Sequence, residues 1–140
     1  MEAKQFLKQY QNILTDIRIL EAQKLELENL AMSVTVSADG ERVQSSGRKD
    51  RMAELAVKIA DAEREIVEQR TQAFHKLREI EQVIAQVKTS DYRKILHMRY
   101  IENQTWGKIA VSLNCSYQWV CKLHGRALLE TEKVLKVDKS

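Results

Sequence analysis

The stretch that decides the fold is WGKIAVSLNCSYQWVCKLHG, which covers residues 106–125. Two helices that cross at a steep angle and are joined by a short turn need a small residue at the crossing and apolar residues on the inside. Counted from Trp106, the crossing position holds Ala110. The inward positions hold four apolar residues and one cysteine: Ile109, Leu113, Cys115, Val120 and Leu123. The spacing therefore predicts a helix-turn-helix unit.

Polar residues at the expected helix boundaries support this prediction. Thr105 and Ser116 each stand just before one of the two helices, where a side-chain oxygen can cap free backbone N–H groups. Asn114 lies in the turn and tolerates the left-handed backbone conformation. Ser90 is a third candidate cap, for a preceding helix over residues 91–102. We therefore expect a compact domain of three helices over residues 89–140.

The second helix of this unit has an outward face without acidic residues. The face presents Tyr117, Gln118, Cys121 and Lys122, and no carboxylate follows until Glu130. It suits the major groove, because phosphates repel carboxylates and base edges are read by amide, hydroxyl and cationic groups. An ordinary bundle of two amphipathic helices would share the apolar positions but would not explain this face. The segment therefore predicts binding to double-stranded DNA.

The candidate DNA-binding residues fall into two groups. Gln118 is the first candidate for a base contact, and Tyr117, Cys121 and Lys122 are close behind it. Phosphate contacts are expected from residues that offer a hydroxyl group, a helix N-terminus or a positive charge. These residues are Thr105, Lys108, Ser116 and Arg126.

The two tryptophans could also contact a nucleic acid, because an indole can stack on a base or cover a phosphate. Trp106 is expected to pack across the helix N-terminus against the preceding helix. Trp119 is compatible with either a packing role or a contact with DNA.

Residues 1–88 read as a long helical hairpin. A heptad stripe predicts a first helix over residues 3–32 and a second over residues 48–88, with a polar loop at about 33–47 between them. The first stripe consists of Phe6, Tyr10, Ile13, Ile17, Leu20, Lys24, Leu27 and Ala31. The second consists of Met52, Leu55, Ile59, Ala62, Ile66, Gln69, Ala73, Leu77, Ile80, Ile84 and Val87. Neither helix can bury its stripe alone, so we expect an antiparallel pair, which a second copy of the chain could complete as a homodimer. The second helix is longer than the first, and its extra stretch at 74–87 is expected to contact the C-terminal domain or that second copy.

Composition places the chain among all-α proteins. Of 140 residues, 31% are charged and 6% aromatic, with four glycines and no proline. No apolar run is long enough to cross a bilayer, and the start MEAKQFLKQYQ lacks the apolar core of a signal peptide. We expect a cytoplasmic protein with no membrane partner. The two cysteines form no disulfide or zinc-ligand pattern, so we expect reduced thiols.

Positive charge is concentrated at the C-terminal end. Residues 1–47 carry five Lys and Arg against seven Asp and Glu, residues 48–88 carry nine against eight, and residues 89–140 carry nine against five. A basic excess is typical of nucleic-acid binding, although a soluble surface alone could also account for it.

Patterns that would indicate an enzyme are missing from the sequence. It has no nucleophile in a recognisable turn, no glycine-rich phosphate loop and no carboxylate cluster outside helix surfaces. The three histidines, His75, His97 and His124, lack the spacing of metal ligands. We therefore expect a non-enzyme without a metal or cofactor.

The run YRKILHMRYIENQTWGKIAVSLNCSYQWVCKLHGRAL, residues 92–128, resembles the fourth conserved region of bacterial sigma factors. It follows the pattern LxxRYxxxxxxxxIAxxLxxSxxxV, with Arg-Ala further on. It is more similar still to small phage late-transcription regulators of the RinA and ArpU kind, through the elements at 116–120 and 124–128. The resemblance implies a phage or prophage DNA-binding activator in the bacterial host cytoplasm, with RNA polymerase as a further partner. The first ninety residues lack the parts with which a complete sigma factor melts a promoter.

Two other function classes are compatible with the same features. One is a DNA-packaging component similar to a small terminase subunit, in which, however, the DNA-binding unit usually precedes the oligomerising helices. The other is a coiled-coil adaptor whose C-terminal domain binds protein. A sequence-specific transcription regulator is the leading expectation.

Overall fold

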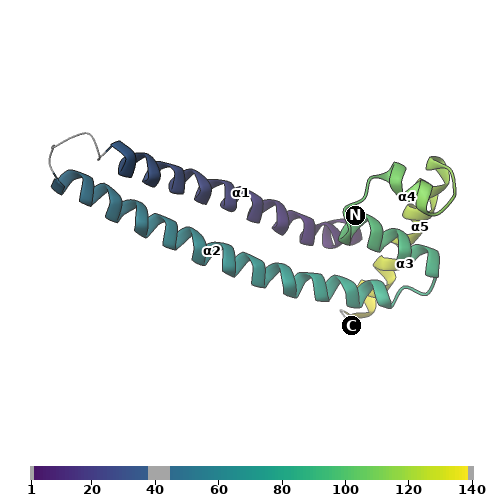
Figure 1. Ribbon diagram of the computed structural model, residues 1–140. Coiled ribbons are helices and arrows are strands. Elements are labelled where there is room, and N and C mark those ends of the chain that lie inside the picture. The colour runs from purple at the N-terminus through teal and green to yellow at the C-terminus, as the bar shows by residue number, and fades with distance from the viewer. Residues whose placement is uncertain (1, 38–44, 139–140) are drawn as a thin grey trace. The chain divides into compact units, whose positions relative to one another are not determined.

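The computed structural model describes residues 2–37 and 45–138, and all regular structure in these ranges is helical. In chain order the elements are α1 (Glu2–Ser37), α2 (Ser45–Ala85), α3 (Ser90–Leu96), the π-helical turn η2 (His97–Ile101), α4 (Trp106–Ser112) and α5 (Tyr117–Asp138) (Figure 1). The predicted all-α class is confirmed for this part of the chain. None of the helices described here is both long and apolar enough to span a membrane.

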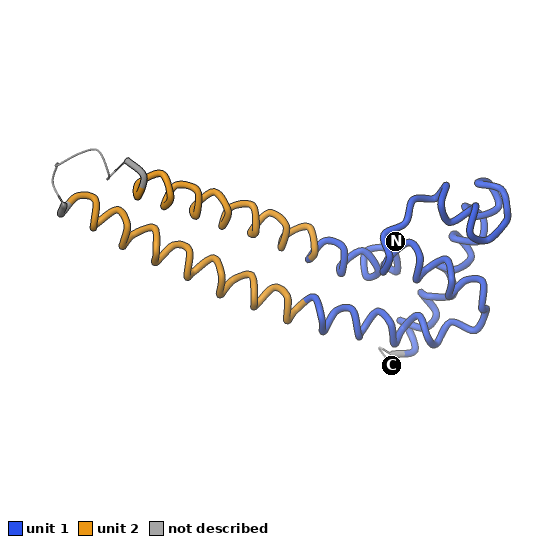
Figure 2. Tube along the Cα trace, in the orientation of Figure 1, with its two compact units in different colours: residues 1–13, 73–140 blue, residues 14–72 orange. Residues whose placement is uncertain are grey.

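The chain divides into two compact units, which Figure 2 colours separately. Unit 1 consists of residues 1–13 and 73–140, and unit 2 consists of residues 14–72. The long helices α1 and α2 thus contribute one stretch to each unit. The division between residues 88 and 89 that the sequence suggests follows the linkers along the chain, and it stays a prediction.

In unit 2, α1 and α2 run side by side in opposite directions. Glu21 on α1 pairs with Arg70 on α2, with Oε1 and Nη2 2.9 Å apart. Further along α1, Lys24 Nζ lies 3.2 Å from Glu63 Oε1. The partner on α2 moves toward its start as the position on α1 advances, which is the order of an antiparallel pair. Within this unit, α1 and α2 therefore form an antiparallel pair.

The loop predicted at about 33–47 is too long. Residues 33–37 continue α1 and residues 45–47 begin α2, while the part of the prediction at 38–44 lies outside the described residues. Within this extension of α1, the hydroxyl of Thr35 donates to the carbonyl of Ala31 at 3.0 Å and lies 3.9 Å from the sulfur of Met52 on α2. The helix thus continues through Ser33, Val34 and Thr35, residues of weak helix propensity.

Unit 1 is held together by a core to which α1, α2, α3, η2 and α5 contribute. Its buried residues are Ala3, Leu7, Ile80, Ile84, Val87, Leu96, Tyr100, Ala127 and Leu128. The surplus end of α2, which was expected to contact the C-terminal domain or a second chain, thus packs against the C-terminal helices. Gln11 adds a polar link, because its amide donates to the backbone carbonyls of Tyr100 and Ile101 at 3.1 Å each.

Hydrogen bonds hold the link between the end of α2 and the start of α3. The N–H groups of Gln86 and Val87 bond to carbonyls three residues back, those of Val83 and Ile84, instead of four residues back. This spacing tightens the last turn. The guanidinium of Arg93 then donates to the carbonyls of Val87 at 2.6 Å and Lys88 at 2.9 Å. Both carbonyls belong to the link between α2 and α3, so Arg93 of α3 holds this link against the start of its own helix.

The helix expected at 91–102 differs from the prediction at both ends. Ser90 is not the cap but the first helical residue, because Thr89 takes the extended backbone at the cap position and makes no side-chain cap bond. From His97 the helix widens into η2, in which the N–H of Glu102 bonds to the carbonyl of His97. Asn103 follows with a φ of 56° and breaks the helix.

Candidate nucleic-acid interface

The two helices of the predicted helix-turn-helix unit, α4 and α5, pack through a small core in unit 1. Ile109, Ala110, Val120 and Leu123 are buried in it together with Ile95 of α3. Leu113 and Cys115 are half-buried against the same cluster. All six positions assigned to the inside from spacing therefore face the inside. Each needs its residue type because it fills the space between α4, α5 and α3.

The connection between α4 and α5 is a tight turn. Asn114 has a φ of 53°, the left-handed conformation expected of it. Its N–H bonds to the carbonyl of Val111 at 3.1 Å, and the N–H of Cys115 bonds to the carbonyl of Ala110 at 3.0 Å. These bonds satisfy carbonyls at the end of α4. The turn is thus held by its own backbone and fixes the start of α5.

Hydroxyl groups cap both helices as the sequence predicts. Thr105 Oγ1 accepts a bond from the N–H of Lys108 at 3.3 Å, and Ser116 Oγ accepts one from the N–H of Trp119 at 3.1 Å. Each hydroxyl oxygen is therefore already engaged as an acceptor, while its proton is free to be donated. A phosphate contact by Thr105 or Ser116 would use that proton, because a phosphate only accepts hydrogen bonds.

All eight residues predicted to contact DNA have exposed side chains in the same unit. They are Thr105, Lys108, Ser116, Tyr117, Gln118, Cys121, Lys122 and Arg126. We define the outer face of α5 as Tyr117, Gln118, Cys121 and Lys122, which occupy the first two turns of the helix. Tyr117 is 56% exposed, a high value for a large ring with an apolar body. These side chains are available to a partner molecule.

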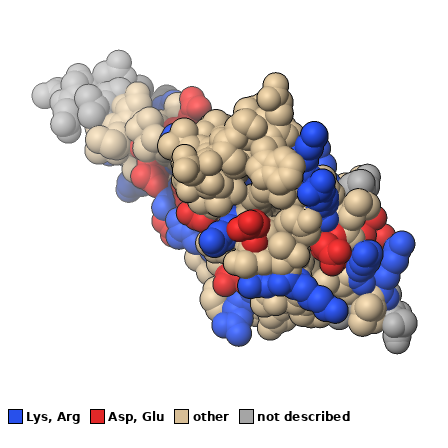
Figure 3. All heavy atoms as spheres, turned by 90° about the vertical axis from the view of Figure 1, so that its right-hand side faces the viewer, with Lys and Arg blue, Asp and Glu red and all other residues tan. Residues whose placement is uncertain are grey.

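Acidic groups are absent from this part of the surface but present elsewhere in unit 1. No Asp or Glu occurs between Gln104 and Leu129, so the whole of α4, the turn and the first half of α5 lack a carboxylate. Figure 3, which views this end of the molecule, shows blue and red side chains next to one another across the rest of the face. The electrostatic distinction of the α4–α5 segment is therefore the lack of acid rather than a dense basic patch.

Arg126 and Trp119 form a pair that was not predicted from the sequence. The guanidinium carbon of Arg126 lies 5.4 Å from the centre of the Trp119 ring, which is 43% exposed. The two residues are seven apart, which is two helical turns, so this spacing was the signal that could have revealed them. The contact holds the Arg126 charge near the outer face of α5, and it makes Trp119 part of the exposed surface rather than of the core.

Trp106 packs against the preceding helical segment, as expected. The guanidinium carbon of Arg99 lies 4.3 Å from its ring centre, and the ring of His124 contacts it edge-on at 4.5 Å. His124 Nε2 in turn lies 2.7 Å from the hydroxyl oxygen of Tyr100. We call Arg99, Tyr100, Trp106 and His124 the aromatic junction. It joins η2 to both α4 and α5.

Burial keeps the aromatic junction free of ionised rings at neutral pH. It lowers the pKa of His124 to about 4, helped by the positive charges of Lys4 and Arg99. Burial also raises the pKa of Tyr100 to about 12, against a smaller lowering by Arg99. The hydrogen bond between the two residues therefore joins a neutral imidazole to a neutral phenol. Both are polar groups that burial tolerates because they are paired.

Comparison with protein families assigns this chain to one of them. A family model described as a protein of unknown function, DUF1492, matches residues 31–132, so the chain belongs to that family. The match includes all of α2, α3, η2 and α4 and most of α5. Neither the comparison with curated proteins nor the comparison with solved structures gives a match.

Proposed function

We propose that this member of the family is a sequence-specific transcription regulator that binds double-stranded DNA through α4 and α5, acting as a helix-turn-helix. In this proposal α5 enters the major groove with its first two turns, and α4 lies across the phosphate backbone. The proposal extends the resemblance to the fourth region of sigma factors, and with it the expectation of a phage or prophage activator that also contacts RNA polymerase.

The observation that carries the proposal is an exposed, acid-free outer face on a helix whose other side is fully packed. Val120 and Leu123 are buried, in alternation with the exposed Gln118, Cys121 and Lys122. A rigid helix with such a face presents amide, hydroxyl and cationic groups to base edges without repelling phosphates. The two capped helix starts and the tight turn support the same role, because they fix the orientation of α5.

The proposed contacts follow from the chemistry of each side chain. Gln118 reads a base through its amide, which can donate and accept together, as adenine requires in the major groove. Lys108 and Arg126 carry charge that holds phosphates, and Thr105 and Ser116 add the hydroxyl protons that their caps leave free. Lys122 lies beside the candidate base contacts, and its charge also strengthens binding to a duplex of any sequence. The exposed ring of Trp119 extends this surface.

Selection of bound sequences from random duplexes tests the specific part of the proposal. We expect the full chain to enrich one sequence motif. Gln118→Ala should then weaken binding to that motif by roughly 1–3 kcal/mol, with little effect on a scrambled duplex, because a lost base contact affects only the specific complex. The matched control is Gln82→Ala, which removes an exposed amide from α2 in the same unit.

Two results would contradict the assignment of Gln118. One is equal weakening of the specific and scrambled duplexes by Gln118→Ala. The other is a loss of the same size in Gln82→Ala, which would trace the effect to something other than the outer face of α5. Failure to enrich any motif would favour an adaptor role in which the C-terminal helices bind protein.

A further inference from the structure

Unit 2 leaves unusually many large apolar side chains in contact with water. Among its described residues, only Ile17 and Ile66 are buried hydrophobic residues. Six large apolar side chains of the unit are more than half exposed: Ile19, Leu25, Leu30, Met32, Val57 and Val67. Two helices alone cannot enclose a core, and the stripe between them also includes Lys24 and Gln69. The unit therefore has more apolar surface than its own fold can cover.

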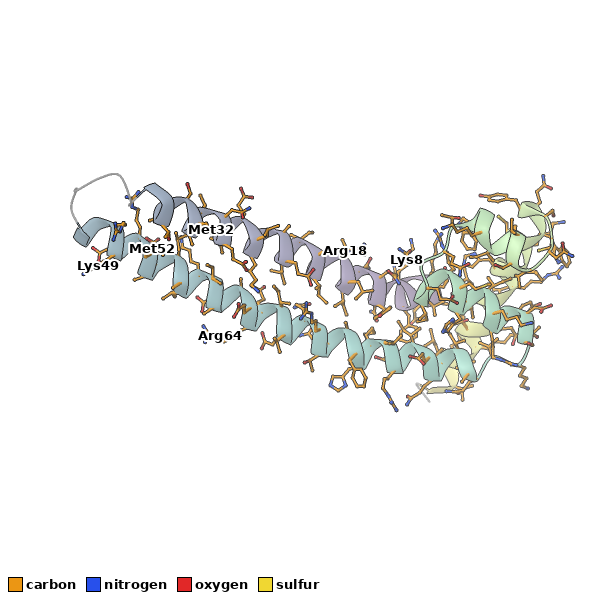
Figure 4. All side chains as sticks on the ribbon, viewed as in Figure 1. Lys8, Arg18, Met32, Lys49, Met52 and Arg64 are labelled. Carbon is orange, nitrogen blue, oxygen red and sulfur yellow. The ribbon has the colours of Figure 1, made fainter. Side chains whose placement is uncertain are left out.

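Part of this surface lines a groove on one side of the helix pair. The groove has a volume of about 390 Å³. Leu25 of α1 and Val67 of α2 flank it, with the buried Ile66 between them. Val57 and Ile19 do not line it. Figure 4 shows the side chains along both helices, with Arg64 pointing from α2 away from α1. Of the six exposed apolar residues of the unit, Leu25 and Val67 are thus the two that line this groove.

The charges around the groove are mixed and paired. Glu21, Glu28 and Glu63 alternate with Lys24 and Arg70 along its edges. Lys24 Nζ reaches both Glu63 at 3.2 Å and Glu28 at 3.5 Å, and Arg70 reaches Glu21 at 2.9 Å. Such an edge attracts neither a polyanion nor an anionic membrane surface. It is compatible with a partner whose edge carries the same mixture of signs, which a second copy of this chain does by definition.

We infer that this groove is a homodimer interface, in which the groove faces of two copies of unit 2 meet around Leu25 and Val67 to form a four-helix bundle. Two adjacent helices of about 24 residues present a face roughly 36 Å long and 20 Å wide, or about 700 Å² per chain. Stable interfaces bury about 600–1,000 Å² per partner, and a face of this size falls within that range. A two-fold arrangement also places each apolar flank of one copy within reach of its equivalent in the other.

The mass of the full chain in solution tests the inference, and it does not depend on DNA binding. Sedimentation equilibrium at micromolar concentrations should give twice the mass of one chain. Leu25→Glu combined with Val67→Glu should raise the dimer dissociation constant by about tenfold or more, because each substituted carboxylate appears twice in a two-fold interface. The control is Ile19→Glu with Val57→Glu, which adds the same charges to exposed apolar positions outside the groove and should leave the dimer intact.

Far-UV circular dichroism of both double variants shows whether the substitutions unfold the chain. Because all four positions are more than half exposed, each variant should keep the helix content of the unaltered chain. A monomeric unaltered chain, or a ring of eight or more subunits as in a DNA-packaging component, would overturn the inference. So would a dimer that persists in the groove variant, or one that the control pair disrupts equally.

Discussion

The two compact units are both built from helices, yet they bury very different numbers of apolar side chains. Within the part of the chain that the structure describes, sixteen buried hydrophobic residues belong to unit 1 and two to unit 2. Unit 1 reaches this number because short helices at several angles enclose a core from several sides. Unit 2 has only two helices, which cover one side of each other. The difference indicates that unit 1 has a core of its own, whereas unit 2 leaves more of its apolar side chains exposed.

The largest expected effect is on the stability of the two units when one leucine is shortened. Leu96→Ala removes a side chain that is 0% exposed from the core of unit 1, and it should cost about 2–5 kcal/mol of unfolding free energy. Leu27→Ala in unit 2 removes a half-buried side chain and should cost about 1 kcal/mol. Urea unfolding followed by circular dichroism measures both. Equal losses would contradict the contrast between the units.

A second effect concerns the crossing of α4 and α5. Ala110 is 7% exposed in the small core between them, so Ala110→Leu should force the helices apart and cost about 1–3 kcal/mol. Ala22→Leu, at an exposed position of α1 in unit 2, should change stability by less than about 0.5 kcal/mol. Thermal unfolding of the two variants compares them. If Ala110→Leu were as stable as Ala22→Leu, the close crossing would not be a requirement of the fold.

The aromatic junction should make the stability of unit 1 depend on pH. Because the folded-state pKa of His124 is lowered to about 4, its contribution is complete above the ordinary value of about 6.5 and is lost as the pH falls toward 4. We expect a loss of about 1–2 kcal/mol between pH 7 and pH 4.5, reduced by solvent screening at the partly exposed ring. His124→Gln should lack this component. Identical pH profiles of the two proteins would show that His124 is not the group responsible.

The smallest expected effect is on stability, and it compares Ser116, which caps a helix, with Ser90, which does not. Ser116→Ala removes the hydroxyl that accepts the N–H of Trp119, and it should cost about 1 kcal/mol. Ser90→Ala removes a hydroxyl from the first turn of α3, where the cap position belongs to Thr89, and should cost less than about 0.5 kcal/mol. Thermal unfolding is sensitive enough for this comparison. A larger loss in Ser90→Ala would restore Ser90 as the cap.

The periodic positions were predictable because the helical repeat alone decides which side chains share a face. Ile109 and Val120 could be assigned to the inside, and Gln118 to the outside, without any knowledge of their neighbours. The same reasoning correctly placed caps at Thr105 and Ser116. These features depend on residues only a few positions apart.

Features that depend on contacts between distant residues could not be predicted in this way. The extended part of α1 brings Thr35 against Met52 of α2, and the link after α2 is held by Arg93, which reaches the carbonyls of Val87 and Lys88. The widened turn η2 places Arg99 against Trp106, which no local pattern indicates. For the candidate site, exposure of the eight residues is established, whereas their contacts with DNA remain a proposal.

The salt dependence of DNA binding tests the central claim most directly, because it counts the phosphates that the protein contacts. Fluorescence anisotropy with a random duplex should show an affinity that falls as salt rises from about 50 to 200 mM. Lys122→Ala should reduce the slope of log affinity against log salt by about 1, while Lys136→Ala, in the last turn of the same helix, should leave it unchanged. No affinity at the lowest salt, or a reduced slope in Lys136→Ala but not in Lys122→Ala, would contradict the claim that the outer face of α5 binds DNA.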